Sequence, residues 1–183
     1  MLHAMDPITW NPRRIAIGGV TGVGKTTMAR RIAAILELPF TELDSLYHGP
    51  DWTARSSFES DVDAITSGSS WVTEWQYRVV RPMILTRADT LVWLDLPTSV
   101  SLARLARRTL IRRVRRQEIW NGNKEPKLRT IFTDPDHILR WGYRTRNDVR
   151  KMMPDVEANY QSLQIVHLRS AREVEQWLEQ LSA

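Results

Sequence analysis

Short apolar runs alternate with amphipathic stretches along most of the chain. Clear apolar runs lie at residues 14–18, 91–94 and 163–168, and shorter ones at 40–43 and 71–73. Apolar runs without polar alternation are typical of strands that are buried on both faces of a parallel sheet. The pattern therefore predicts five buried strands.

Between these runs, apolar residues recur at the spacing of one helix face. This spacing occurs at 27–36, 58–65 and 174–181, and a shorter helix is expected to continue through Leu85. Strands that alternate with helices predict an α/β fold of three layers, in which helices cover both faces of a five-stranded parallel sheet. We see no internal repeat, so residues 1–183 are predicted to form a single domain.

Residues 98–116 predict a long helix that carries many arginines. We expect its inward face to hold Leu102, Leu105 and Leu110. Capping-box spacing at 56–59 and 170–173 predicts where two other helices begin.

The segment at 117–136 has weak periodicity, an Asn-Gly step and Pro126. Long irregular segments in compact domains tend to be functional, so we predict an Arg-rich lid or flap between a core at 13–116 and the C-terminal part at 137–183. The next helix should begin at 133–135 and end near Pro154, because proline is favoured in a first turn and disfavoured in an interior.

One motif lies between the first predicted strand and the first predicted helix. Residues 19–26, Gly-Val-Thr-Gly-Val-Gly-Lys-Thr, match the phosphate-binding P-loop pattern G-x-x-x-x-G-K-[ST]. Backbone N–H groups of such a loop surround phosphate oxygens, the lysine reaches the β- and γ-phosphates, and the hydroxyl ligates Mg²⁺. The pattern predicts ATP and Mg²⁺ as cofactors, held by Gly19, Thr21, Gly22, Val23, Gly24, Lys25, Thr26 and Thr27.

Two other classes of P-loop protein fit less well. GTPases carry an N-K-x-D motif, and the nearest match at 123–126, Asn-Lys-Glu-Pro, lacks the aspartate. Motors of the AAA type need a longer chain with further motifs.

The net charge of +5 is unevenly distributed. The chain has 22 Arg against four Lys, and residues 104–150 hold fourteen basic and five acidic residues. A compositional bias toward Arg can explain the total, but the clustering favours an anionic partner. Cysteine is absent and the four histidines are scattered, which argues against a thiolate or histidine metal site.

The same sequence gives little sign of a membrane partner. No apolar run approaches the ~20 residues that span a bilayer, and residues 1–12 lack the layout of a signal peptide. We expect a cytoplasmic protein, either a monomer or a homodimer.

The chain resembles the small P-loop kinases, and adenylate-kinase-like proteins in particular. Their third strand ends in D-G-F-P-R, and residues 74–78, Glu-Trp-Gln-Tyr-Arg, keep an acid and an Arg at that offset, with Glu for Asp and a different middle. Leu-Asp-Leu-Pro at 94–97, followed by Arg104 and Arg108, is similar to the segment that opens their lid.

A closer resemblance is to a bacterial group of "topology modulation" P-loop proteins. Residues 43–52 and 87–95 are similar to segments of that group, and the likeness covers most of residues 13–110. The substrate of the group is poorly defined, so the resemblance implies architecture more than chemistry.

Three acids are candidates for the Mg²⁺ site or for the base. The resemblance places the strand of Glu74 beside the P-loop strand, which favours Glu74 as the metal residue and gives Asp95 a structural role. Asp44, at the end of the second predicted strand, matches an acid of shikimate-kinase-like enzymes and could be the general base. An N-cap or Asx-turn role for Asp44 stays open.

Arginines are the candidates for phosphate and acceptor binding. The resemblance implies that Arg78, with Arg81 behind it, grips the acceptor, and that Arg104 and Arg108 clamp ATP phosphates. Arg140, Arg144 and Arg146 are candidates after the lid, and Arg144 is counted among the catalytic residues. Aromatic side chains could stack on a planar acceptor or belong to the core, namely Tyr47, Trp52, Trp75 and Tyr77.

These features predict a small-molecule kinase that transfers the γ-phosphoryl group of Mg·ATP to a nucleotide, nucleoside or other small hydroxyl or phosphate acceptor. The alternative is an ATP-regulated nucleic-acid-binding protein, one that modulates DNA topology without phosphotransfer. A toxin-like kinase acting on a cell-wall sugar nucleotide would share the first chemistry.

Overall fold

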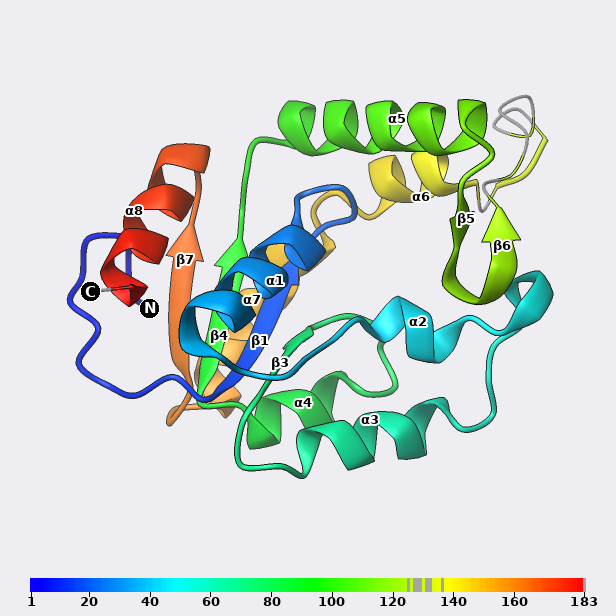
Figure 1. Ribbon diagram of the computed structural model, residues 1–183. Coiled ribbons are helices and arrows are strands. Elements are labelled where there is room, and N and C mark those ends of the chain that lie inside the picture. Colours follow the sequence, from blue (N-terminus) through cyan, green and yellow to red (C-terminus); the bar gives the residue numbers. More distant parts are fainter. Residues whose placement is uncertain (125, 127–129, 131–132, 136, 183) are drawn as a thin grey trace.

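The computed structural model has five parallel strands at its centre (Figure 1). It describes residues 1–124, 126, 130, 133–135 and 137–182. The sheet has the order β2-β3-β1-β4-β7. These strands are β1 (Arg14–Gly19), β2 (Phe40–Thr41), β3 (Trp71–Glu74), β4 (Thr90–Leu94) and β7 (Gln164–Leu168). The predicted five-stranded parallel α/β fold is confirmed.

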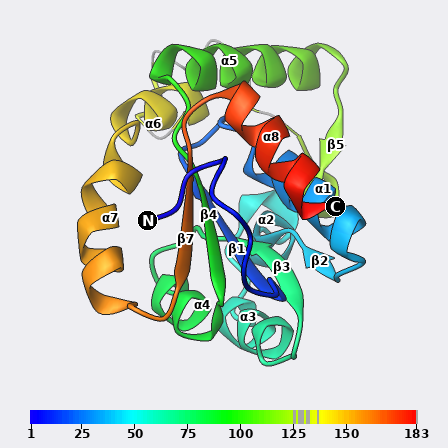
Figure 2. The same cartoon turned by 90° about the vertical axis from the view of Figure 1, so that its left-hand side faces the viewer.

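Helices cover both faces of the sheet (Figure 2). One face packs on α1 (Lys25–Leu36) and α8 (Ala171–Leu181), and the other on α3 (Phe58–Thr66), α4 (Arg81–Arg87) and α7 (Asp148–Asn159). Each face has its own apolar core, and these cores bury the alternating sides of the central strands.

The remaining elements lie toward the carboxyl ends of the strands (Figure 1). They are α2 (Leu43–Tyr47), η1 (Pro50–Trp52), α5 (Thr98–Val114), β5 (Glu118–Ile119), η2 (Trp120–Gly122), β6 (Asn123–Lys124) and α6 (Ile138–Arg144), where η denotes a 3-10 helix. Ligands of open α/β sheets bind at this edge, so the functional site is expected there.

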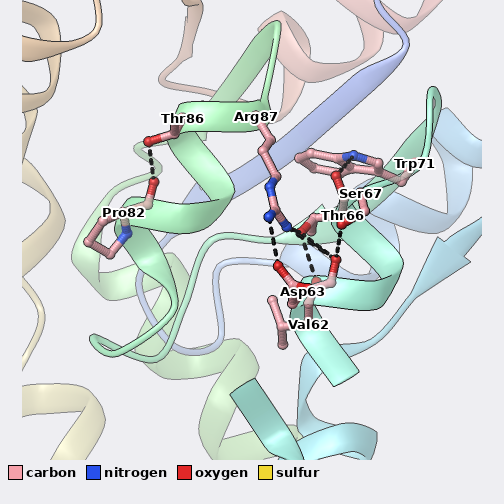
Figure 3. Close-up of polar contacts among 8 residues, drawn as sticks. All are labelled: Val62, Asp63, Thr66, Ser67, Trp71, Pro82, Thr86 and Arg87. Carbon is pink, nitrogen blue, oxygen red and sulfur yellow. Dashed lines mark hydrogen bonds and ion pairs between the residues drawn. The ribbon is translucent and has the colours of Figure 1, made fainter. Parts of the chain in front are cut away.

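A polar contact fixes the packing of α4 against α3 (Figure 3). The Arg87 guanidinium donates to the Asp63 carboxylate at 2.6 Å and to the Thr66 hydroxyl at 2.7 Å. The indole N–H of Trp71, at the start of β3, donates to the Thr66 carbonyl at 3.0 Å. The Thr66 carbonyl at the end of α3 thereby gains a partner from the strand that follows the turn at 67–70.

A small hairpin, β5 to β6, is anchored against the α2–η1 segment. The buried Asn123 amide donates to the carbonyls of Gly49 and Trp120, both at 2.8 Å, and accepts from the Trp52 backbone N–H at 2.9 Å. The Asn121 amide also donates to the α2–η1 segment. Residues 117–124 of the predicted flap therefore form an anchored hairpin, while 125, 127–129, 131–132 and 136 lie outside the described residues.

The second predicted strand is shorter than expected. β2 ends at Thr41, and Asp44 lies in the first turn of α2 rather than at a strand end. Leu43 becomes fully buried when the chain turns here into a helix. Its burial in the core outweighs the extended preference of the apolar run.

The predicted helix from 133–135 to Pro154 is also wrong. Two helices, α6 and α7, occupy this region, and Pro154 lies inside α7. Pro154 has no backbone N–H and so cannot make the usual helical hydrogen bond. The helix face that holds Val149, Met153 and Val156 is buried before and after the proline, and this packing compensates for the lost bond.

Two finer expectations for the helices need correction. Leu110 is 49% exposed, because the inward face of α5 is formed by Ser101, Leu105 and Thr109. The capping box predicted at 56–59 is absent, and Ser57 instead donates to a carboxylate in the next turn.

The helix start predicted at 170–173 is confirmed with Ser170 as the N-cap residue, but the second bond of the capping box goes to Arg169 instead of Ser170. Ser170 Oγ accepts from the Glu173 N–H at 3.1 Å, and the Glu173 carboxylate accepts from the Arg169 N–H at 2.7 Å.

We expect Asn123→Ala to loosen the hairpin, because the substitution leaves two carbonyls and one N–H without their partners. The free energy of unfolding should fall by about 2 kcal/mol, and amide exchange at Trp52 should accelerate. Urea titration and hydrogen exchange measure these effects. Asn159→Ala, at an exposed asparagine, is the matched control, and equal behaviour of the two variants would contradict the anchoring role.

Candidate functional site

The P-loop joins β1 to α1 directly beneath α5. Gly22 and Gly24 have φ angles of 84° and 114°, in the region that only glycine adopts readily. A Cβ atom on Gly22 would lie 2.5 Å from the Ser101 carbonyl oxygen and 2.8 Å from Leu105 Cβ. The loop conformation thus depends on these two glycines and on the close packing of Gly22 against α5.

A hydroxyl, a carboxylate and an ammonium group meet at the start of α1. Thr26 Oγ1 donates to Glu74 Oε1 at 2.5 Å, and Lys25 Nζ lies 3.4 Å from the Val20 carbonyl. Glu74 is 1% exposed. Burial raises the pKa of Glu74, although the nearby Lys25 charge opposes this; burial lowers the pKa of Lys25, opposed by the Glu74 carboxylate.

This cluster suits a phosphate-bound Mg²⁺ ion. Mg²⁺ prefers hard oxygen ligands and retains several waters, so one hydroxyl and one carboxylate are an adequate protein contribution. Within the described part of the chain, no group of three or more His, Cys, Asp or Glu side chains could hold a metal ion. The Thr26 hydroxyl and the Glu74 carboxylate could each supply one ligand to such an ion, together with phosphate oxygens.

A second carboxylate, Asp44, is connected to this cluster through Gln76. The Gln76 amide donates to Asp44 Oδ1 at 2.7 Å and to Glu74 Oε2 at 3.3 Å. Sequence reasoning missed Gln76. Its position two residues after Glu74 was an available signal, because residues i and i+2 of an extended chain point to the same side.

Tyr77 gives Asp44 a second donor. Its hydroxyl donates to Asp44 Oδ1 at 2.6 Å and lies 3.3 Å from His48 Nε2. Burial and the Asp44 charge raise the pKa of Tyr77, so its proton is retained at neutral pH. The φ angle of Tyr77 is 59°, an uncommon conformation for a bulky residue and a recurrent feature of functional sites.

Asp95 has other partners. Its carboxylate accepts from Arg150 Nε at 2.6 Å and lies 3.0 Å from His167 Nε2. These contacts tie the end of β4 to α7 and β7, in keeping with the structural role expected for Asp95.

The candidate arginines occupy different places. Arg104 Nη1 donates to the Val23 carbonyl at 3.0 Å, and the charge of Arg108 contributes to the lowered pKa of Lys25. Four arginines, with Ile111 and Gln117, line an open hollow of about 310 Å³ along α5: Arg104, Arg107, Arg108 and Arg112. Arginine side chains thus extend from the P-loop along α5.

On the acceptor side, Arg78 is exposed, whereas Arg81 is half-buried. The Arg81 guanidinium lies 5.2 Å from the centre of the Trp75 ring, and its charge also lowers the pKa of Lys25. Arg144 instead lies over Trp141 of its own helix, 5.0 Å from the ring centre. The structure therefore brings Arg81 closer to the P-loop cluster than the sequence suggested.

The aromatic candidates mainly contact one another. Tyr47 and Tyr77 are stacked with ring centres 4.2 Å apart, and the Trp75 ring is buried. Trp52 and Trp120 both pack on His48. The rings of Tyr47, Tyr77, His48, Trp52 and Trp120 thus connect α2, η1 and the hairpin, whereas Trp75 contacts Arg81.

The chain was compared with family models, with curated proteins and with solved structures. No family model matches the chain. The ATP-dependent protease ATPase subunit HslU of Helicobacter pylori (strain G27) is 36% identical over 67 residues, which are 37% of this chain and 15% of that protein. The chain thus matches a small part of that much longer relative.

Solved structures match over nearly the whole chain. Shikimate kinase from Acinetobacter baumannii, in complex with shikimate, has a TM-score of 0.56 and 14% identity over 93% of this chain and 91% of that one. Shikimate kinase from Bacteroides thetaiotaomicron has a TM-score of 0.54 and 16% identity, over 93% of this chain and 97% of that one. A gluconokinase from Sinorhizobium meliloti 1021 has a TM-score of 0.51 and 19% identity, over 93% of this chain and 92% of that one.

The chain therefore shares a three-layer α/β fold with these solved structures. No helix in the described ranges is both long and apolar enough to span a bilayer. The resemblance to the topology-modulation group stays a prediction.

We expect Glu74→Gln to stabilise the nucleotide-free protein at neutral pH, because it removes the cost of burying a carboxylate while keeping an acceptor for Thr26. The pKa of Glu74 is raised in the folded protein, whereas in the unfolded chain this carboxyl ionises near its ordinary pKa of about 4.3. As the pH rises from that value to the folded-state pKa, only the unfolded state loses the proton, so the wild type loses stability over this range. The difference in Tm should thus be small at pH 4 and positive at pH 8.

Thermal unfolding in EDTA at these pH values measures this difference. Glu59→Gln, at an exposed glutamate of α3, is the control and should change stability little. A lower Tm for Glu74→Gln at pH 8 would contradict the account.

Proposed function

We propose that the protein is a kinase that transfers the γ-phosphoryl group of Mg·ATP to a small molecule with a hydroxyl or phosphate acceptor. The observation that supports this most strongly is the contact of Thr26 with Glu74 beside Lys25, linked through Gln76 to Asp44. One carboxylate suits the metal and the other suits an acceptor. A binding site for ATP alone would not need the second one.

The donor half is formed by the P-loop and the first turn of α1. Backbone N–H groups of residues 21–27 would hold phosphate oxygens, with the positive end of the α1 dipole behind them. Lys25 would neutralise charge at the β- and γ-phosphates, and Thr26 and Glu74 would hold Mg²⁺. Bound Mg·ATP supplies the phosphoryl group that is transferred.

The acceptor half is formed by Asp44 and its neighbours. With Gln76 and Tyr77 both donating to Oδ1, the other oxygen, Oδ2, would accept the proton of an acceptor hydroxyl. Arg81 and the exposed Arg78 would attract an anionic group on the same acceptor. Arg104 and Arg108 would neutralise developing charge from the α5 side, and Arg144 stays a candidate for the same role.

We expect Lys25→Ala to lower acceptor-dependent ADP formation by at least about 100-fold, because the positive charge that would contact the β- and γ-phosphates is lost. The measurement is ADP release with a panel of nucleoside monophosphates, nucleosides, sugars and small hydroxy acids. Lys151→Ala, an exposed lysine on α7, is the matched control and should keep full activity. If no acceptor raises ADP release above background in the wild type, the kinase proposal is wrong.

A second prediction distinguishes the role of Asp44 as the base from the role of Tyr77, which positions it. Asp44→Asn should lower kcat by about 10²- to 10⁴-fold without changing the KM for ATP, because the proton acceptor is lost and the donor site is intact. Tyr77→Phe should lower kcat by a smaller factor, since it removes one of two donors to Asp44. Steady-state kinetics with the acceptor found above measure both effects, and an unchanged kcat in Asp44→Asn would exclude the base role.

A further inference from the structure

The segments of α5 and α6 carry more arginines than Arg104 and Arg108, the two that lie near the P-loop. The sequence of 98–116 contains seven arginines and that of 137–147 contains three, and neither contains an acidic residue. The two helices lie side by side above the carboxyl ends of the strands (Figure 1), where Gly142 of α6 packs directly against Leu105 of α5. Arg104 and Arg108 are directed to the P-loop, so the name α5–α6 surface is used here for the arginines of α6 and the other arginines of 98–116.

Two aromatic rings project from this surface. Trp141 is 44% exposed and Tyr143 is 58% exposed. Gly142, which lies between them, faces α5, so the rings project on either side of the outward face of α6. Arg140 and Arg144, one turn apart, lie between the two rings on that face.

Arginines accompany both rings. The Arg144 guanidinium lies 5.0 Å from the centre of the Trp141 ring, and the Arg146 guanidinium lies 4.1 Å from the centre of the Tyr143 ring. Exposed rings and planar guanidinium groups are what single-stranded nucleic acids stack on, while arginines bind the phosphate backbone in a bidentate manner. The combination of both chemistries on one short helix selects this class of ligand.

An anionic membrane explains the surface less well. Membrane-surface helices present a long, continuous apolar face with basic residues at its edges. On α6 the outward face is itself arginine, with a ring at each side, and the exposed apolar residues of α5, such as Val114, alternate with arginines. Duplex DNA would use the charge but would leave the two rings without bases to stack on.

We propose that the α5–α6 surface binds single-stranded nucleic acid, RNA or DNA, through its arginines and through stacking on Trp141 and Tyr143. This binding does not require phosphoryl transfer, so the proposal can be tested independently of the kinase activity.

The test is fluorescence anisotropy of the full-length protein with a fluorescein-labelled 20-nucleotide single strand, as RNA and as DNA, at several salt concentrations. We expect binding that weakens linearly in log Kd against log salt. Trp141→Ala should weaken single-strand binding about tenfold and duplex binding much less, whereas Trp141→Phe, which keeps a ring, should restore most of the loss.

A charge-matched pair isolates the position of the arginines. Arg140→Gln with Arg144→Gln should lower the salt slope by about 2, because each lost phosphate contact lowers it by about 1. Arg13→Gln with Arg172→Gln makes the same change in net charge at exposed positions outside the surface and should leave the slope unchanged.

Three results would overturn the proposal. The first is no single-strand binding at 50 mM salt by a protein that is folded by circular dichroism. The second is equal weakening by the two double variants, which would indicate net charge alone. The third is binding to phosphatidylserine vesicles that depends on Trp141 while single-strand binding does not.

Discussion

The hydrogen bond from Thr26 to Glu74 is the contact on which the site depends. It exists because β3 lies directly beside β1, with Ile17 paired to Glu74, so the end of β3 meets the first turn of α1. The strand order β2-β3-β1 produces this arrangement. After β1 the chain forms the outer strand β2 first, and then places β3 between β2 and β1. The contact buries a carboxylate whose raised pKa records the cost, and sites that bind charged ligands commonly carry such a cost.

The second half of the site is built outward from the same point. Gln76 continues the line of β3 and reaches both carboxylates, and Tyr77 adopts a left-handed conformation that directs its hydroxyl to Asp44. The rings of Tyr47 and Tyr77 stack, which offsets the backbone strain of Tyr77. Asn123 then joins the hairpin, which follows α5 in the chain, to the neighbouring η1 segment.

Most of the fold could be predicted from the sequence, because buried parallel strands and amphipathic helices leave distinct patterns. The P-loop followed from a motif, whereas Glu74 was one of three acids at strand ends and was favoured by the resemblance to adenylate-kinase-like proteins. The failures have a common cause, namely tertiary packing that local patterns do not encode: Leu43 is buried by turning the chain into α2, Pro154 is accepted inside α7, and Leu110 is left exposed. The contacts of Asn123 with Gly49 and Trp52, and of Gln76 with Asp44, join residues far apart in the sequence, so periodicity could not reveal these partners.

The most direct test of the account is a calorimetric titration with a non-hydrolysable ATP analogue, with and without Mg²⁺, on the wild type and on Thr26→Val. If Thr26 and Glu74 hold the metal that accompanies the nucleotide, Mg²⁺ should tighten binding to the wild type and have little effect on binding to Thr26→Val. An equal Mg²⁺ effect in both proteins, or no binding by the wild type, would contradict the assignment of this cluster as a Mg·ATP site.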